Sequence, residues 1–220
     1  MTLVIGIIGP PCSGKSLVAE SLCEHGGRWI NADQIAQGQL DDPEVIETLQ
    51  GRWGRLVLRE DHRIDRGEVA RKVFGRDTAS RVELRFLESV VHPRVRQQIR
   101  RELNEAVDRQ APLAVLDVPL LIESTWDHVC DDVICMEVNE TAHAAMARQR
   151  GWDSDELMRR QQSQIPLAEK RRRSTASFSN NGSRDDLVAQ VATFLASRRP
   201  TTAASSPPAD GHCLGVPAIW

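Results

Sequence analysis

A glycine-rich segment near the N-terminus has the residue types and spacing of a phosphate-binding loop. Residues 9–16 read Gly-Pro-Pro-Cys-Ser-Gly-Lys-Ser, which satisfies the pattern GxxxxGK[ST]. In such a loop, successive backbone N–H groups point at one spot beside a helix N-terminus, where the helix dipole also favours an anion. We therefore expect Lys15 to contact the β- and γ-phosphates of ATP and the Ser16 hydroxyl to bind Mg²⁺.

Two prolines restrict which residues of this loop can hold phosphate. Pro10 and Pro11 have no backbone N–H, so they cannot donate a hydrogen bond to it. The predicted ATP-binding residues are accordingly Cys12, Ser13, Gly14, Lys15, Ser16 and Leu17. Cys12 has two interpretations. A thiol near a helix N-terminus could have a lowered pKa and oxidise readily, or Cys12 could simply fill a small-residue position, which we favour.

Lysine is rare in this chain, which has 25 arginines and three lysines. A compact ammonium fits inside a backbone loop where a planar guanidinium does not, and this explains Lys15. We interpret Lys72 as a solvated helix charge. Lys170 is interpreted as part of a surface run with Arg171–Arg173, acting as a lid hinge or phosphate contact and not as a nucleic-acid site, because aromatic residues are not interleaved with it.

Further residues along the chain could complete a phosphoryl-transfer site. Asp33 follows the second predicted strand and could be the catalytic base, although it could equally cap a helix that starts at Gln34. Asp117 ends an apolar strand, where a carboxylate could contact Mg²⁺ through water. A mobile, arginine-bearing lid is predicted further on, with Arg148, Arg150, Arg159 and Arg160.

The elements that would position these residues alternate between strands and helices. Leu3–Ile8 is a continuous apolar run, typical of a strand buried on both faces, and 15–23 has helical spacing. A second short strand starts at Trp29 and ends near Asp33. The runs Leu113–Val118 and Val133–Val138 repeat the buried-strand pattern. This order predicts a doubly wound α/β fold with a parallel sheet.

The remaining segments are predicted to be helical or unstructured. In the middle of the chain we expect two charged helices, 79–91 and 94–107, separated by a break at His92–Pro93. Ser183 is a predicted N-cap for a helix that ends at Arg198 and covers one face of the sheet. The predicted organisation is one kinase domain over 1–199, with a core (1–39, 110–138, 174–199), a helical acceptor-binding insert (40–109), a lid (139–173) and a flexible Pro/Ala/Ser-rich tail (200–220).

Composition narrows the class of protein. The chain has 220 residues, of which 40% are hydrophobic and 27% charged, and its formal net charge is −3. Such a charge creates no general attraction for nucleic acid or anionic membranes, so we exclude both as partners. Five cysteines without a CxxC pair suggest reduced thiols in the cytoplasm. The oligomeric state is not specified by any pattern, and we favour a monomer.

Beyond the loop, the sequence resembles the dephospho-CoA kinase family from about residue 3 to 198. The family segments are present in order, although none after the loop is decisive alone. They are 13–16, Ala32–Ala36, Ile64–Arg66 ahead of Val73–Phe74, His92–Pro93, Val118–Glu123, the lid residues Arg150, Gln164 and Lys170, and Asn180–Gly182.

The resemblance implies an activity and roles for individual residues. Members of this family use ATP to phosphorylate the ribose 3′-hydroxyl of dephospho-CoA, the last step of coenzyme A biosynthesis. By resemblance, Asp33 draws the proton from that hydroxyl, Arg150 closes over ATP, and Asn181 belongs to the nucleotide site. The acceptor site would be shaped by His92, Pro93, Leu120 and Glu123.

Alternative interpretations stay open at this stage. His92–Pro93 could be only a helix-ending turn, and the leucines after Pro119 could be ordinary packing. A nucleoside monophosphate kinase is disfavoured because a phosphate acceptor needs no base at Asp33. A catalytically idle nucleotide-binding protein is disfavoured by the intact Lys15, Ser16 and Asp33. A GTPase is disfavoured because asparagine precedes none of the lysines, as an NKxD motif requires.

Overall fold

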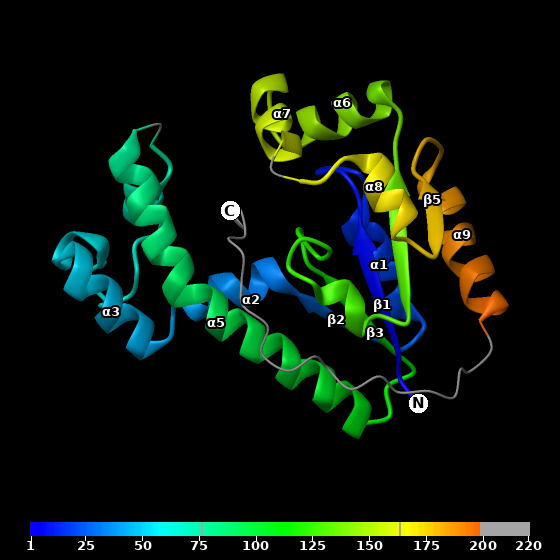
Figure 1. Cartoon of the computed structure of the whole chain (residues 1–220), viewed down its shortest axis with the longest axis horizontal. Coiled ribbons are helices and arrows are strands. Elements are labelled where there is room, and N and C mark those ends of the chain that lie inside the picture. The colour runs from blue at the N-terminus through cyan, green and yellow to red at the C-terminus, as the bar shows by residue number, and fades with distance from the viewer. Residues whose placement is uncertain (76, 163, 199–220) are drawn as a thin grey trace. The chain divides into compact units, whose positions relative to one another are not determined.

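The computed structural model describes residues 1–75, 77–162 and 164–198 (Figure 1). The described chain divides into two compact units: the first comprises residues 1–31 and the described residues from Leu103 to Arg198, and the second comprises the described residues of Ala32–Glu102. The predicted tail at 200–220 lies outside the described residues. The described helices include none that is both long and apolar enough to cross a membrane.

The first unit contains a five-stranded parallel sheet in the order β2-β3-β1-β4-β5. In the central strand β1, Ile5 lies opposite Val115 of β3 and Asp132 of β4. The strands are β1 (Leu3–Ile8), β2 (Gly27–Asn31), β3 (Leu113–Asp117), β4 (Asp132–Glu137) and β5 (Ala176–Ser179). The parallel α/β fold and its first four strands are confirmed, whereas β5 was not predicted.

Helices α1 (Lys15–Glu24) and α9 (Arg184–Ser197) pack on each other and cover one face of the sheet. Figure 1 shows α9 alongside β5 at the edge of the sheet. The core between these helices and the strands is fully buried and includes Ile5, Ile7, Val18, Leu22, Ile134, Met136 and Val191. Ser183 caps α9 and exchanges hydrogen bonds with Asp186 in a capping box, which confirms the predicted N-cap.

The opposite face of β1 is covered by the segment that follows β3. Gly6 points to this side, and a Cβ there would lie 2.9 Å from Cys130 Sγ and 3.0 Å from Leu121 Cδ1. Leu120 and Leu121 are 2% and 0% exposed. Glycine at position 6 therefore allows this segment, which includes the short helix η2 (Trp126–Val129), to approach the sheet closely.

Three helices lie within the predicted lid: α6 (Glu140–Gln149), α7 (Ser154–Gln162) and α8 (Leu167–Arg172). Asn139 caps α6 by accepting a hydrogen bond from the backbone N–H of Ala142 at 2.8 Å. On α7, Glu156 forms ion pairs with Arg159 and Arg160, and the Arg160 guanidinium lies 4.3 Å from the ring centroid of Trp152.

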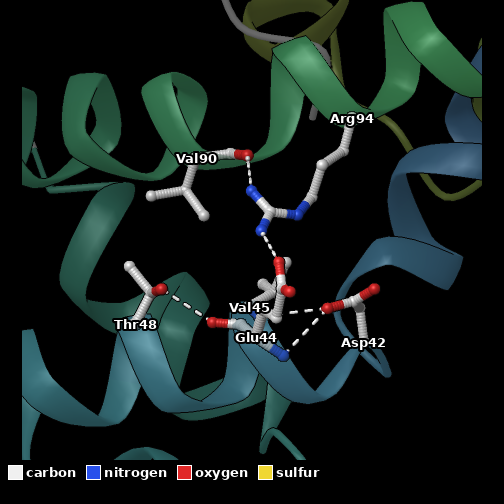
Figure 2. A network of polar contacts seen from close by, with 6 residues as sticks. All are labelled: Asp42, Glu44, Val45, Thr48, Val90 and Arg94. Carbon is white, nitrogen blue, oxygen red and sulfur yellow. Dashed lines mark hydrogen bonds and ion pairs between the residues drawn. The ribbon is translucent and has the colours of Figure 1, made fainter.

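The second unit is helical. Its elements are α2 (Ala32–Gln39), α3 (Pro43–Trp53), the short helix η1 (Arg55–Val57), α4 (Arg66–Val73) and α5 (Thr78–Asp108), whose last turns belong to the first unit. Asp42 begins α3 by accepting hydrogen bonds from the N–H groups of Glu44 and Val45 at 2.9 and 3.3 Å (Figure 2). Asp65 caps α4 in the same way.

Helix α5 is continuous through Pro93, so the predicted break at His92–Pro93 is wrong, and the pair is not a helix-ending turn. Proline inside a helix costs about 3 kcal/mol because it removes one hydrogen bond and crowds the preceding turn. Every fourth residue around it is buried: Leu87, Val91, Val95 and Ile99 are 1–4% exposed. Burying each such side chain contributes about 1.5–3 kcal/mol, which together outweighs the proline.

Arg94 supports the helix beside this proline. Its Nη1 donates to the Val90 carbonyl oxygen at 3.3 Å, and its Nη2 donates to Glu44 Oε2 at 2.8 Å (Figure 2). One guanidinium thus links α5 to the first turn of α3 within the second unit.

Candidate active site

The phosphate loop, residues 9–16, joins β1 to α1 as predicted, and its backbone leaves little room for substitution. Gly9 has φ +150° and Gly14 has φ +92°. A Cβ on Gly9 would lie 2.7 Å from Met136 Cβ, and one on Gly14 would lie 2.3 Å from Asn180 Nδ2. Cys12, which is not a glycine, also has a left-handed backbone, with φ 56°. The loop therefore has a constrained shape.

Side chains from three other segments bind the carbonyl groups of this loop. His143 on α6 lies with Nε2 2.5 Å from the Pro11 carbonyl oxygen, so Nε2 carries the hydrogen, because a carbonyl oxygen can only accept. Asn180, which follows β5, donates from Nδ2 to the Ser13 carbonyl oxygen at 3.0 Å. Lys170 on α8 donates to the Gly9 carbonyl oxygen at 3.3 Å. These bonds fix the peptide planes of the loop and hence the direction of its N–H groups.

Lys15 also bonds to the loop itself. Its Nζ donates to the carbonyl oxygens of Pro10 at 2.7 Å and Gly9 at 3.3 Å. The Ser13 hydroxyl beside it is buried and has no hydrogen-bond partner among the described residues. A buried polar group in this position is suited to a ligand that brings its own polar atoms.

Lys170 is 3% exposed, so its interpretation as part of a surface run is wrong. Its ammonium bonds to the Gly9 carbonyl oxygen and to Gln164 Oε1. Burial, together with the nearby charge of Lys15, lowers the pKa of Lys170 to about 8, although Glu123 and Cys135 act in the opposite direction. The side chains of Arg171–Arg173 instead pair with the carboxylates Glu137, Glu169 and Asp127.

Asp117 ends β3 and is 7% exposed. Its Oδ2 accepts a hydrogen bond from Asn31 Nδ2, at the end of β2, at 3.3 Å. Burial raises the pKa of Asp117, while the charges of Lys15 and Arg150 act to lower it. Lys15 and Arg150, both predicted to contact ATP, are therefore within electrostatic range of Asp117. Asp117 lies where the strands of the sheet end, which is where ligands bind in open α/β folds.

Cys12 does not have the reactive thiol that one interpretation of the sequence suggested. It is 6% exposed, and burial raises its pKa, with Arg150, Lys15 and Arg160 acting against this rise. A lowered pKa is thus contradicted, and Cys12 fits the alternative of a small residue filling a tight position in the loop.

Glu123 contacts the segment between α7 and α8. Its Oε1 accepts a hydrogen bond from the Ile165 N–H at 2.9 Å. A cavity of about 340 Å³ opens between this segment, α7 and the phosphate loop; its lining includes Pro10, Met158, Gln164, Ile165, Leu167 and Lys170.

Other predicted site residues of the first unit have defined surroundings. Asn181 accepts from the Asn139 N–H at 2.7 Å and donates to Ser179 Oγ at 2.8 Å, which ties the turn after β5 to the start of α6. Ser16 and Leu17 lie in the first turn of α1, where Leu17 packs against the core. The burial of Leu120 agrees with packing, and its contact with substrate stays a prediction.

Asp33, His92 and Pro93 belong to the second unit. Asp33 is exposed and lies in the first turn of α2, which begins at Ala32, so Asp33 does not cap a helix starting at Gln34. Burial and the charge of Arg96 lower the pKa of His92 on α5, and its Nε2 has no hydrogen-bond partner within the described residues. Pro93 is exposed. The catalytic role of Asp33 and the acceptor-site roles of His92 and Pro93 stay predictions.

Sequence reasoning missed two residues that hold the phosphate loop. Asn180 lies in the Asn-Asn-Gly segment on which the family resemblance rests, so that segment was a usable signal. His143 had no signal, because one histidine on a helix face does not reveal which carbonyl it meets 132 positions away in the chain.

A parallel sheet with a GxxxxGK[ST] loop between its central strand and the following helix defines a P-loop nucleotide-binding protein of the α/β class. A sequence profile of the family described as dephospho-CoA kinase matches residues 3–186. The chain therefore belongs to the dephospho-CoA kinase family.

Individual relatives agree with this assignment. A dephospho-CoA kinase of Rhodopirellula baltica is 43% identical over 196 residues, covering 89% of this chain and 91% of that protein. One from Symbiobacterium thermophilum is 39% identical, covering 86% and 78%. A crystal structure from Thermus thermophilus superposes with a TM-score of 0.71 at 33% identity, covering 89% of this chain and 97% of the other. The dephospho-CoA kinase of Campylobacter jejuni shares the fold, with a TM-score of 0.65 at 21% identity over 89% and 96% of the two chains.

Proposed function

We propose that this protein transfers the γ-phosphoryl group of ATP to the ribose 3′-hydroxyl of dephospho-CoA, giving coenzyme A and ADP. The observation that carries the proposal is the family match over residues 3–186, which includes the complete phosphate loop. The reaction would be the last step of coenzyme A biosynthesis, and we place it in the cytoplasm, with a monomer as the working unit.

The ATP half of the reaction depends on the first unit. The N–H groups of Cys12 to Ser16 would hold the phosphates, with Lys15 as a point charge beside them. Phosphoryl transfer passes through a loose transition state, so catalysis consists mainly of positioning and neutralising charge. Arg150, which follows α6 and acts on both Cys12 and Asp117 through its charge, would close over the transferred group.

The residues present fit Mg²⁺ as the metal ion. Mg²⁺ keeps several waters and binds through substrate phosphates and only one or two side chains. Two such side chains are present: Asp117 ends β3 and is 7% exposed, and Ser16 lies in the first turn of α1. Ser16 would bind the ion directly and Asp117 through water. When bound, Mg²⁺ would neutralise negative charge on the phosphates.

Asp33 would accept the proton of the 3′-hydroxyl. A carboxylate suits this task because a loose transition state asks more for orientation than for strong basicity. His92, Pro93, Leu120 and Glu123 would shape the acceptor site.

Replacing Asp33 tests this role. Asp33→Asn keeps the size of the side chain but cannot accept the proton, so we expect transfer to fall by about a hundredfold or more while ADP binds as before. The rate and ADP affinity are measured by a coupled assay and by calorimetry. Asp41→Asn, an exposed carboxylate of the same unit that pairs with Arg66 at 3.7 Å, is the matched control. Undiminished turnover in Asp33→Asn would remove Asp33 from the mechanism.

A coupled ADP-release assay with Mg·ATP tests the function itself. The acceptors are dephospho-CoA, AMP, CMP, adenosine and shikimate, and we expect turnover with dephospho-CoA alone. Turnover with a nucleoside monophosphate but none with dephospho-CoA would refute the proposal in favour of another small-molecule kinase.

A further inference from the structure

Lys170 is a buried lysine that forms no ion pair with a carboxylate of the described residues. It is 3% exposed. Burying an unpaired ammonium is strongly unfavourable, because the charge loses its hydration without gaining an opposite charge. The acceptors of Lys170, the Gly9 carbonyl oxygen and Gln164 Oε1, are neutral, and a neutral side-chain donor could also bond to them. These hydrogen bonds therefore do not explain why a positive charge is placed here.

The ammonium groups of Lys170 and Lys15 share one hydrogen-bond acceptor. Both Nζ atoms lie 3.3 Å from the same acceptor, the carbonyl oxygen of Gly9. Two like charges on one carbonyl repel each other, and the charge of Lys15 contributes to the lowered pKa of Lys170. Glu123 offsets this repulsion only in part, since the pKa of Lys170 is still lowered, and an anion bound between the two ammonium groups would offset it further.

The hydrogen bonds of Lys170 leave it able to receive such an anion. An ammonium has three N–H donors. Gly9 and Gln164 accept two of them within the described residues, so one donor is available. Gln164 precedes Ile165, whose N–H is held by Glu123. The same ammonium therefore contacts the phosphate loop on one side and the segment between α7 and α8 on the other.

We propose that Lys170 is a second phosphate-binding lysine, which contacts the phosphate chain of a nucleoside di- or triphosphate beside Lys15 while Gln164 ties it to the segment before α8. This rests on the proposed ATP site. It also explains the choice of lysine: a guanidinium in a 3%-exposed position would require five donors to be satisfied instead of three.

Nucleotide affinity is the first test. Lys170→Met keeps most of the side-chain volume and removes the charge. We expect ADP to bind about tenfold to a hundredfold more weakly by calorimetry, as for the loss of a charged hydrogen bond, and AMP to change by less than about twofold. Arg172→Met removes an exposed cation of the same helix, whose partner is Glu169, and should leave both affinities unchanged. Unchanged ADP affinity in Lys170→Met would overturn the proposal.

Proton uptake separates phosphate binding from a purely structural role. The charged groups that face Lys170 are Lys15 and Glu123, with Arg171 next to it on α8, and the titratable thiol of Cys135 also faces it. At a pH of about 8.5, part of the Lys170 population is neutral in the free protein, and an arriving phosphate favours the charged form. Wild-type protein should take up protons when ADP binds, as measured in buffers of different ionisation enthalpy. Lys170→Met should lose this uptake, whereas persistent uptake would contradict the proposal.

A folding defect leaves the proposal testable. Lys170→Gln, which retains a hydrogen-bond donor for Gly9, is the second variant, and thermal melting checks both. If neither variant folds, absence of proton uptake in the wild type is sufficient to overturn the inference. The two proposals also fail separately. Normal ADP binding with proton uptake but no turnover of dephospho-CoA would refute the function alone, and turnover without proton uptake would refute the role of Lys170 alone.

Discussion

The cations around the phosphate loop and the exposed arginines of α7 and α8 have different kinds of partner. At the loop, Lys15 of the loop itself and Lys170 from α8 donate to backbone carbonyl oxygens. On α7 and α8, Arg159 and Arg172 instead pair with carboxylates of their own helix, Glu156 and Glu169. Exposed pairs of this kind contribute little to stability because water and salt screen them. Lys170 bonds to neutral groups among the described residues, so its charge is available to a ligand.

The largest effect should come from the loop. Lys15→Ala removes the point charge at the phosphates, and we expect kcat to fall by about a thousandfold or more. Lys15→Arg should not restore it, because the guanidinium does not fit the loop. A coupled ADP-release assay measures both, and Lys72→Ala on α4 is the control for loss of a lysine elsewhere. Substantial activity in Lys15→Arg would contradict the distinction between the two cations.

A second prediction concerns how the charge of Lys170 changes the free energy of unfolding with pH. The pKa of Lys170 is lowered to about 8 from an ordinary value of 10.5. Between these values the unfolded chain binds more protons than the folded one, so this group makes the free energy of unfolding rise as pH increases from about 8 towards 10.5.

The measurement is a pair of urea titrations at several pH values, in wild type and in Lys170→Met. The comparison is needed because burial raises the pKa of the cysteines Cys12, Cys23, Cys130 and Cys135, and these thiols lower stability as pH rises. The difference between the two proteins isolates Lys170. A difference that does not vary with pH would show that its charge is compensated in the folded state.

A third, smaller effect should follow from removing a neutral anchor of the loop. His143→Leu deletes the hydrogen bond to the Pro11 carbonyl oxygen, and we expect ADP to bind more weakly by up to about tenfold. Calorimetry measures the affinity. His128→Leu, at an exposed histidine of η2, is the matched control. Equal affinity in both variants would show that the loop keeps its shape without this bond.

The smallest effect is expected on the surface of α8. Arg172→Ala breaks the pair with Glu169, and we expect the melting temperature to change by about 2 °C or less, with turnover unchanged. A marked loss of activity would mean that Arg172 does not act only on its own helix.

Much of the first unit could be predicted because its signals are local. The apolar run of β1, the loop pattern and the helical spacing after Lys15 occur in one continuous segment. Ser183 was a recognisable N-cap because capping depends on only a few neighbouring residues. β5 was not recognisable: it has four residues, and only Phe178 among them is buried.

The errors arose where distant parts of the chain decide the outcome. Pro93 signals a break by itself, and only the burial of side chains such as Leu87 and Val95 explains why α5 continues. Lys170 belongs to a helix of six residues, too short for periodicity to show which face is inward. Its burial depends on Gly9, which is 161 positions away in the sequence.

The paired prolines of the phosphate loop have a thermodynamic consequence. Pro10 and Pro11 restrict φ in the unfolded chain as well as in the folded one, so fewer conformations are lost when the loop orders. Anchors from α6, α8 and the turn after β5 hold the remaining peptide groups in the protein before any nucleotide is bound. Ordering a residue costs about 1–2 kcal/mol in conformational entropy. In this loop the entropy is lost when the protein folds and not when the nucleotide binds. The loop is preorganised, and more of its interaction energy with phosphate is retained as affinity.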